Sequence, residues 1–268
     1  MVPVLFVAAC SDDKAAAPSS SASAPASSVA PERALRILVS NDDGVGAPGI
    51  DALVTALAAE PNVTVTVVAP AENQSGSGGK TSPGPVAASD ATTASGHAAV
   101  SVQGFPADAV DYALTTVLKE RPDVVITGTN AGQNLGPFID LSGTVGAARA
   151  GAARGIPALA VSAGFGDPVD FGAATSLAVR WLRDHRAALV RSPAPAAFVD
   201  NLNAPTCPSG HVRDLALVTV EASASGDDAL AAPDCTSTTP APAGDVSAFH
   251  IGFATLSRVP LAAAPGGP

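Results

Sequence analysis

Short apolar runs alternate along the chain with segments in which apolar residues recur every three or four positions. The short runs predict strands over 35–39, 63–68, 100–102, 124–126, 158–161, 197–202, 215–220 and 249–255. The segments with helical spacing predict helices over 49–59, 107–119, 144–154 and 171–190. Apolar strands separated by helices are typical of a parallel sheet that is covered on both faces. We therefore expect an α/β protein with a three-layer, Rossmann-like fold and a mostly parallel sheet.

The first 31 residues have a different pattern. A short apolar run, 2–9, ends in small residues before Cys10, and Ser, Ala and Pro dominate from there to Pro31. Small residues before a cysteine resemble the lipobox of bacterial lipoproteins, and a segment so poor in large apolar residues cannot bury a core. We predict a lipoprotein-type signal remnant and flexible linker over 1–31 and one folded domain over 32–268. The protein would then be exported, to the cell envelope or the extracellular space, with a lipid anchor at Cys10. A disordered N-terminus with a chance cysteine is the alternative.

Export changes the interpretation of the other two cysteines, Cys207 and Cys235. Both lie in Pro-rich, loop-like sequence, and 221–245 is predicted to be a long loop. Outside the cytoplasm such a pair usually forms a disulfide. A zinc site is the alternative, although no Cys-x-x-Cys or paired His accompanies them.

Composition excludes some classes of function. The chain has 14% charged residues and a net charge of −10. Binding to a nucleic-acid polymer requires clustered Lys and Arg, so we expect none. No apolar run in the sequence reaches the roughly 18–20 residues of a membrane-spanning helix.

Two adjacent carboxylates, Asp42 and Asp43, follow the first predicted strand, within Ser40-Asn41-Asp42-Asp43-Gly44. Ligand sites in parallel sheets form at the carboxyl ends of the strands. Adjacent carboxylates repel each other, and a hard divalent cation would relieve that repulsion. An Asx turn or a helix N-cap is the alternative use of these residues.

Polar, glycine-rich loops follow two other predicted strands. The loop after 63–68 contains Ser75 and ends in Gly-Gly-Lys80-Thr, but it lacks the first glycine of a P-loop. The loop after 124–126 contains Asn130 and Asn134 and leads through Ser142-Gly143-Thr144 into a predicted helix. A helix N-terminus of this kind favours anions. A plain N-cap by Ser142 or Thr144 is the alternative.

Together these segments resemble the SurE family, the survival-protein-E 5′/3′-nucleotidases. The blocks that carry the resemblance occur in order: RILVSNDDGVGAPG (36–49), VVAPAENQSGSG (67–78), GFPADAV (104–110), PDVVITGTNAGQNLG (122–136), SGTVGAARAGAARGIPALAVS (142–162), LNAP (202–205) and GFATLS (252–257). The resemblance covers about 34–257 and implies a SurE-like phosphatase domain.

By this resemblance, the metal ligands are Asp42, Asp43, Ser75 and Asn130. Their oxygens suit Mg²⁺ or Mn²⁺, which would polarise the phosphoryl group and activate a water. The resemblance places Ser142, Gly143 and Thr144 on the phosphate, with Asn41 and Asn134 orienting it. Lys80 stands in a stretch where the family often has a His, and we expect it to add positive charge.

The expected function is metal-dependent hydrolysis of nucleoside 5′- or 3′-monophosphates. The alternatives are a broad acid phosphatase or exopolyphosphatase, and a surface lipoprotein that binds nucleotide or metal without turnover. A homodimer is also expected from the family. With one Trp, one Tyr and eight Phe, the sequence shows no aromatic-rich segment that would stack the base.

Overall fold

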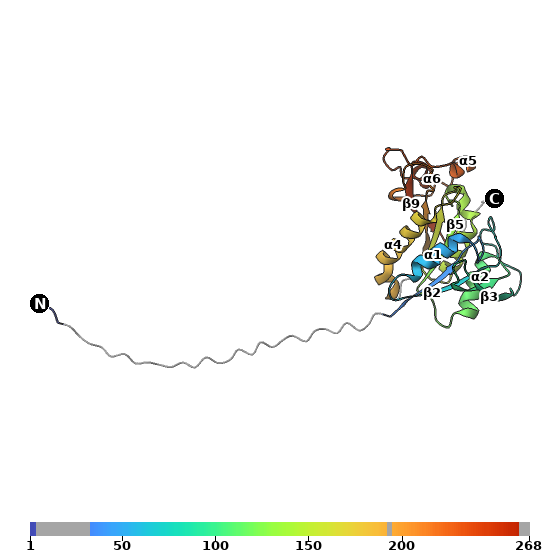
Figure 1. Ribbon diagram of the computed structural model, residues 1–268, viewed down its shortest axis with the longest axis horizontal. Helices are drawn as coiled ribbons and strands as arrows, with labels where there is room; N and C mark the ends of the chain where they lie inside the picture. Colours follow the sequence, from blue (N-terminus) through green and yellow to red (C-terminus); the bar gives the residue numbers. More distant parts are fainter. Residues whose placement is uncertain (4–32, 192–194, 263–268) are drawn as a thin grey trace. The chain divides into compact units, whose positions relative to one another are not determined.

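The computed structural model of the chain describes residues 1–3, 33–191 and 195–262 (Figure 1). Cys10 and nearly all of the predicted linker lie outside the described residues, so the lipid anchor and the domain boundary after residue 31 stay predictions. Within the described ranges, no helix combines the length and the apolar character that crossing a membrane requires.

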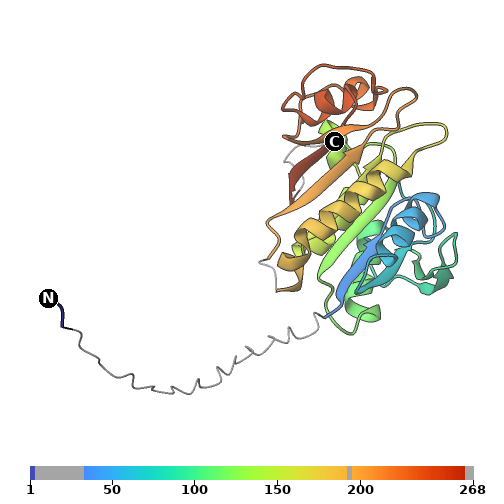
Figure 2. The ribbon, with the colours of Figure 1, turned by 60° about the vertical axis from the view of Figure 1, so that its left-hand side comes forward.

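A nine-stranded sheet organises the described residues of the folded unit (Figure 2). Its strands are β1 (Leu35–Ser40), β2 (Val63–Pro70), β3 (Ala88–Thr92), β4 (Ala98–Val102), β5 (Val124–Ala131), β6 (Ala158–Ala163), β7 (Phe198–Ala204), β8 (Arg213–Val218) and β9 (Phe253–Pro260). Their order across the sheet is β3-β4-β2-β1-β5-β6-β7-β9-β8. The strands from β4 to β7 in this order are parallel, whereas β3 is antiparallel to β4 and β9 is antiparallel to β7. The predicted, mostly parallel sheet is therefore confirmed.

Helices cover both faces of the sheet, as predicted. On one face α1 (Pro48–Ala58) and α4 (Phe171–Val190) lie side by side (Figure 2) and pack on Leu35, Ile37 and Val39 of β1. On the other face α2 (Pro106–Tyr112) and α3 (Gly143–Ala153) pack on Leu38. Successive side chains of a strand point to opposite faces, so β1 contributes to both cores. Short helices complete the fold: η1 (Ala113–Val117), η2 (Gly136–Asp140), α5 (Gly226–Leu230) and α6 (Asp245–His250).

Some predicted elements differ from the structure. The strand predicted over 249–255 begins at Phe253, because Phe249 is a fully buried residue of α6 and Gly252, with a φ of +86°, ends that helix. The helix predicted over 107–119 leaves α-helical geometry after Tyr112 and continues as the π-helical turn η1.

The 221–245 segment, predicted to be a long loop, contains α5, which the side chain of Ser225 caps. The edge strand β3 was not predicted, because its sequence ASDAT has no apolar alternation.

The predicted disulfide between Cys207 and Cys235 is present in the structure, with the two Cα atoms 5.8 Å apart. Cys207 follows β7, and Cys235 is buried in the segment between α5 and α6. The bond therefore ties the 221–245 segment to the carboxyl end of a central strand.

Replacing both cysteines with alanine is expected to lower the free energy of unfolding by about 3–4 kcal/mol, because a cross-link over 28 residues restricts the unfolded chain. Urea denaturation of the wild type and the double variant, each with and without reductant, measures this. Reductant should destabilise the wild type and leave the double variant unchanged. A loss below about 1 kcal/mol would contradict the prediction.

Candidate active site at the carboxyl ends of β1, β2 and β5

Asn41, Asp42 and Asp43 follow directly after β1, a central strand of the sheet. The Nδ2 of Asn41 donates to the backbone oxygen of Gly44 at 2.8 Å and closes a tight turn. Gly44 has a φ of +103°, which favours glycine, and an added Cβ would lie 3.2 Å from the backbone of Glu72. This turn holds both carboxyl groups at the end of β1, as the sequence predicted.

Asp42 lies at the N-terminus of α3. Its Oδ1 accepts a 2.5 Å hydrogen bond from the Oγ1 of Thr144. A Cβ on Gly143 would lie only 2.7 Å from the Cβ of Asp42, so glycine permits this close approach. Burial raises the pKa of the Asp42 carboxyl to about 6; the Thr144 hydrogen bond opposes this shift and the charge of Asp43 adds to it.

Asp43 connects the other two strand ends. Its Oδ2 accepts the backbone N–H of Ala131, at the end of β5, at 3.1 Å. Its Oδ1 accepts a 3.4 Å hydrogen bond from the Nδ2 of Asn73, whose own Oδ1 accepts the backbone N–H of Ser75. Burial raises the pKa of Asp43 above its ordinary value, against the lowering effect of the Ala131 N–H. Asp43 is thus hydrogen-bonded to Ala131, the residue after Asn130. Through Asn73 it is also linked to Ser75.

The loop 71–80 is held against α3 and the β1 turn. The backbone N–H of Gln74 donates to the backbone oxygen of Asp42 at 2.7 Å, and that of Gly78 donates to Leu141 at 3.0 Å. A Cβ on Gly146 of α3 would lie 2.0 Å from the backbone oxygen of Gly78, so this loop and α3 are in direct backbone contact. Ser75 is exposed and Ser77 is buried in this loop.

The residues at this centre fit a hard divalent cation. Among the described residues, neither Asp42 nor Asp43 has an ion-pair partner, although Asp42 is buried and Asp43 is half-buried. Two further buried oxygens, Asn41 Oδ1 and Ser77 Oγ, have no hydrogen-bond partner in the part of the chain that the structure describes. Within the described ranges, no group of three or more His, Cys, Asp and Glu side chains forms a metal site. A cation here would therefore need neutral oxygens besides the two carboxylates, which is the usual ligand set of Mg²⁺.

The residues predicted to bind phosphate fall into two groups. Gly143 and Thr144 lie beside Asp42 in the first turn of α3, while the hydroxyl of Ser142 caps the helix by accepting the N–H of Val145 at 3.1 Å. The first-turn N–H groups of a helix have no partner within it and attract anions.

Asn134 belongs to a different network. Its Nδ2 donates to the Oγ of Ser162 at 2.9 Å, and its backbone N–H and oxygen bond to the side chain of Asn203. A further hydrogen bond joins its backbone oxygen to Asn201. These contacts fix the 131–136 loop on β6 and β7, so Asn134 supports the loop; its contact with phosphate stays a prediction. Lys80 is exposed in the 71–80 loop, and its role likewise stays a prediction.

Sequence reasoning missed two residues of this centre, Asn73 and Ser77. Both lie in the 71–80 loop that the sequence had indicated, but the contacts of Asn73 with Asp43 and the orphaned hydroxyl of Ser77 depend on the folded loop.

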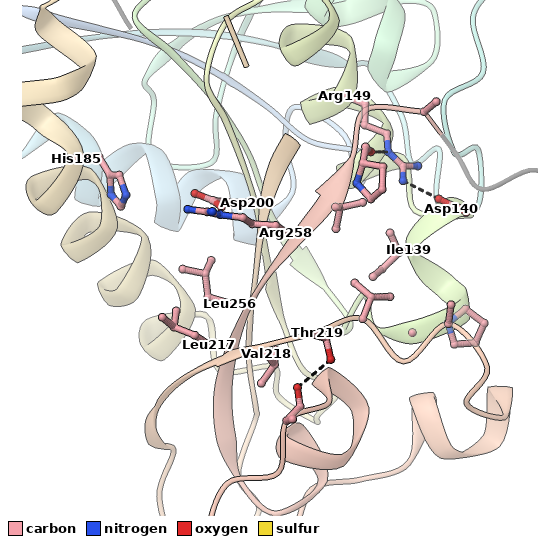
Figure 3. A pocket seen from close by; sticks show the side chains of 18 residues that line it. Ile139, Asp140, Arg149, His185, Asp200, Leu217, Val218, Thr219, Leu256 and Arg258 are labelled. Carbon is pink, nitrogen blue, oxygen red and sulfur yellow. Dashed lines mark hydrogen bonds and ion pairs between the residues drawn. The ribbon is translucent and has the colours of Figure 1, made fainter. Parts of the chain in front are cut away.

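A large cavity of about 1180 Å³ lies elsewhere in the described protein, beside β8 and β9 (Figure 3). Figure 3 shows His185, Asp200 and Arg258 on one side of it and the Arg149–Asp140 ion pair on the other. None of the residues predicted to bind metal or phosphate lines this cavity. Asp42 and Asp43 therefore lie outside this cavity, at the carboxyl end of β1.

Comparison with known proteins shows which family this chain resembles in sequence and in fold. The family model described as "Survival protein SurE" matches residues 37–227. The chain is 39% identical over 180 residues to "5′-nucleotidase SurE" of Methylococcus capsulatus, covering 67% of this chain and 68% of the relative. It is 40% identical over 181 residues to the protein of the same name from Gloeobacter violaceus, covering 66% and 67%. Among solved structures, the SurE protein of Aquifex aeolicus matches with a TM-score of 0.68 and 26% identity, over 86% of this chain and 95% of that one.

Proposed function

This chain belongs to the survival protein SurE family, and we propose that it is a metal-dependent phosphomonoesterase that hydrolyses nucleoside 5′- and 3′-monophosphates to nucleoside and phosphate. The names of its relatives support the 5′ activity. The 3′ activity rests on the family resemblance. The observation that carries the proposal is the adjacent pair of carboxylates, Asp42 buried and Asp43 half-buried, without a basic partner among the described residues and beside a helix N-terminus.

We assign Mg²⁺ or Mn²⁺ to Asp42, Asp43, Ser75 and Asn130. The contacts of Asp43 with Ala131 and Asn73 support this set, because they bring the segments that carry Asn130 and Ser75 to one carboxylate. When bound, the cation would supply Lewis acidity toward the phosphoryl group and a water of lowered pKa.

The other residues bind and orient the substrate in this proposal. The backbone N–H groups of Gly143 and Thr144 bind phosphate oxygens at the positive end of α3. The hydroxyl of Thr144 fixes the rotamer of Asp42 through its short hydrogen bond. The Oδ1 of Asn41, buried and without a hydrogen-bond partner among the described residues, can accept a hydrogen bond from the attacking water and so orient it.

We also propose that the protein is exported and lipid-anchored at Cys10, and that it forms a homodimer. The disulfide supports export, because such bonds are rare in reducing compartments.

The proposed activity is tested by phosphate release from 5′-AMP, 3′-AMP, p-nitrophenyl phosphate and tripolyphosphate in the presence of Mn²⁺ or Mg²⁺. We expect kcat/KM for the two nucleotides to exceed that for p-nitrophenyl phosphate by at least about 10-fold, because the nucleoside adds binding energy at the transition state. Equal values for all monoesters would indicate a broad phosphatase, and preference for tripolyphosphate an exopolyphosphatase. Release from none of them, with Mn²⁺ still bound, would indicate a binding protein.

A further inference from the structure

Phe165 is an exposed aromatic side chain close to the proposed active site. It follows β6, which lies beside β5 in the sheet, so it emerges at the same edge as Asn130. Its side chain is 52% exposed, and it is the only exposed phenylalanine among residues 33–191 and 195–262. Large aromatic side chains contribute most to stability when they are buried. An exposed aromatic side chain beside a site therefore indicates a role in binding a ligand.

The ring of Phe165 lies on the backbone of Gly132. A Cβ added to Gly132 would be 2.5 Å from Cε1 of the ring and 2.6 Å from Cζ. The preceding residue, Ala131, donates its N–H to Asp43. Backbone dimensions therefore place the nearest atom of the ring within about 12 Å of the Asp43 carboxylate. The ribose and base of a substrate whose phosphate lies at the centre can span a separation of this order.

The segment that carries Phe165 is held in place by buried polar contacts. The backbone N–H of Phe165 donates to Oε1 of Gln133 at 3.0 Å, and Nε2 of this buried glutamine donates to Ala229 of α5. The Oγ1 of Thr206 donates to the backbone oxygen of Gly164 at 2.6 Å. The ring is thus presented on a fixed support before any ligand binds.

We propose that Phe165 stacks on the base of the nucleoside monophosphate and makes this enzyme prefer nucleotides to simple phosphate esters. This proposal rests on the function proposed above. Every base has a π-face, so stacking favours nucleotides without selecting one base by hydrogen bonds. The preference is expected to be greater for purines, which cover more of the ring.

The test compares Phe165→Ala, Phe165→Leu and Phe165→Tyr with the wild type on 5′-AMP and on ribose 5-phosphate, which has no base. Phe165→Ala and Phe165→Leu should lower kcat/KM for 5′-AMP by about 10-fold, mainly through KM, and change that for ribose 5-phosphate less than about two-fold. Phe165→Tyr should keep the wild-type preference. Leu217→Ala, which removes an exposed apolar side chain from β8, is the matched control and should leave both substrates unchanged. Equal effects of Phe165→Ala on both substrates, or none, would overturn the proposal.

Equilibrium binding of adenosine 5′-O-thiomonophosphate separates this proposal from the proposed function. Phe165→Ala should weaken binding of this analogue by about 10-fold and leave binding of thiophosphate unchanged. If the wild type hydrolyses nothing but binds the analogue through Phe165, the proposed activity fails and stacking stands. If hydrolysis is intact and binding is independent of Phe165, stacking fails alone. If the wild-type protein does not bind this analogue at all, the stacking proposal is overturned.

Discussion

Replacing Asp42 with asparagine is expected to lower kcat/KM for 5′-AMP by about 10³-fold while the protein stays folded. The substitution keeps the shape of the side chain and an acceptor for the Thr144 hydroxyl, but it removes one of the two charges that would hold the cation. Phosphate release at saturating Mn²⁺ measures the loss. The control is Asp227→Asn, which removes an exposed carboxylate from α5 and should leave the activity unchanged.

The same variant should stabilise the metal-free protein. The pKa of Asp42 is raised to about 6, so the ionised carboxylate lowers stability as the pH rises through that value. Asp42→Asn should therefore raise the free energy of unfolding in EDTA by about 1–3 kcal/mol at pH 7.5 and have little effect near pH 4. Full metal-dependent activity in this variant would show that the cation is bound elsewhere.

Gly146→Ala is expected to lower kcat/KM by about 10²-fold and the free energy of unfolding by about 1–3 kcal/mol. The added methyl would lie 2.0 Å from the backbone oxygen of Gly78, and backbone atoms cannot rotate away. The 77–79 loop must therefore move, and Ser75 moves with it relative to Asp42.

Gly79→Ala is the matched control, because a Cβ there meets nothing within 4 Å and the residue lies in the same loop. It should retain both activity and stability. Steady-state kinetics and urea denaturation of the two variants provide the comparison. Wild-type activity in Gly146→Ala would indicate that the position of the 71–80 loop does not matter for catalysis.

The sequence predicted those parts of the site that depend on local pattern and on sheet topology. Asp42 and Asp43 follow β1, Asn130 lies near the carboxyl end of β5, which extends beyond the predicted 124–126, and the carboxyl ends of parallel strands meet at one edge of the sheet. The pairing of β1 with both β2 and β5 therefore brings the predicted segments together.

Contacts between distant residues could not be predicted in this way. The approach of Gly146 to Gly78 and the network of Asn134 with Ser162 and Asn203 depend on how helix and loops pack. The sequence indicated no aromatic-rich segment for the base, and Phe165 could not be singled out because its exposure and its contact with Gly132 arise only in the fold. The helix at 245–250 was missed for a similar reason: Phe249 is apolar whether it lies in a strand or in a buried helix.

The most direct test of the proposed site is phosphate release from 5′-AMP by the metal-stripped protein as Mn²⁺ is added. We predict no release in EDTA and a saturable rise to full activity with about one Mn²⁺ per chain, because Asp42 and Asp43 form one centre. Release that is equally fast with and without the metal would contradict the assignment of these two carboxylates to a catalytic cation.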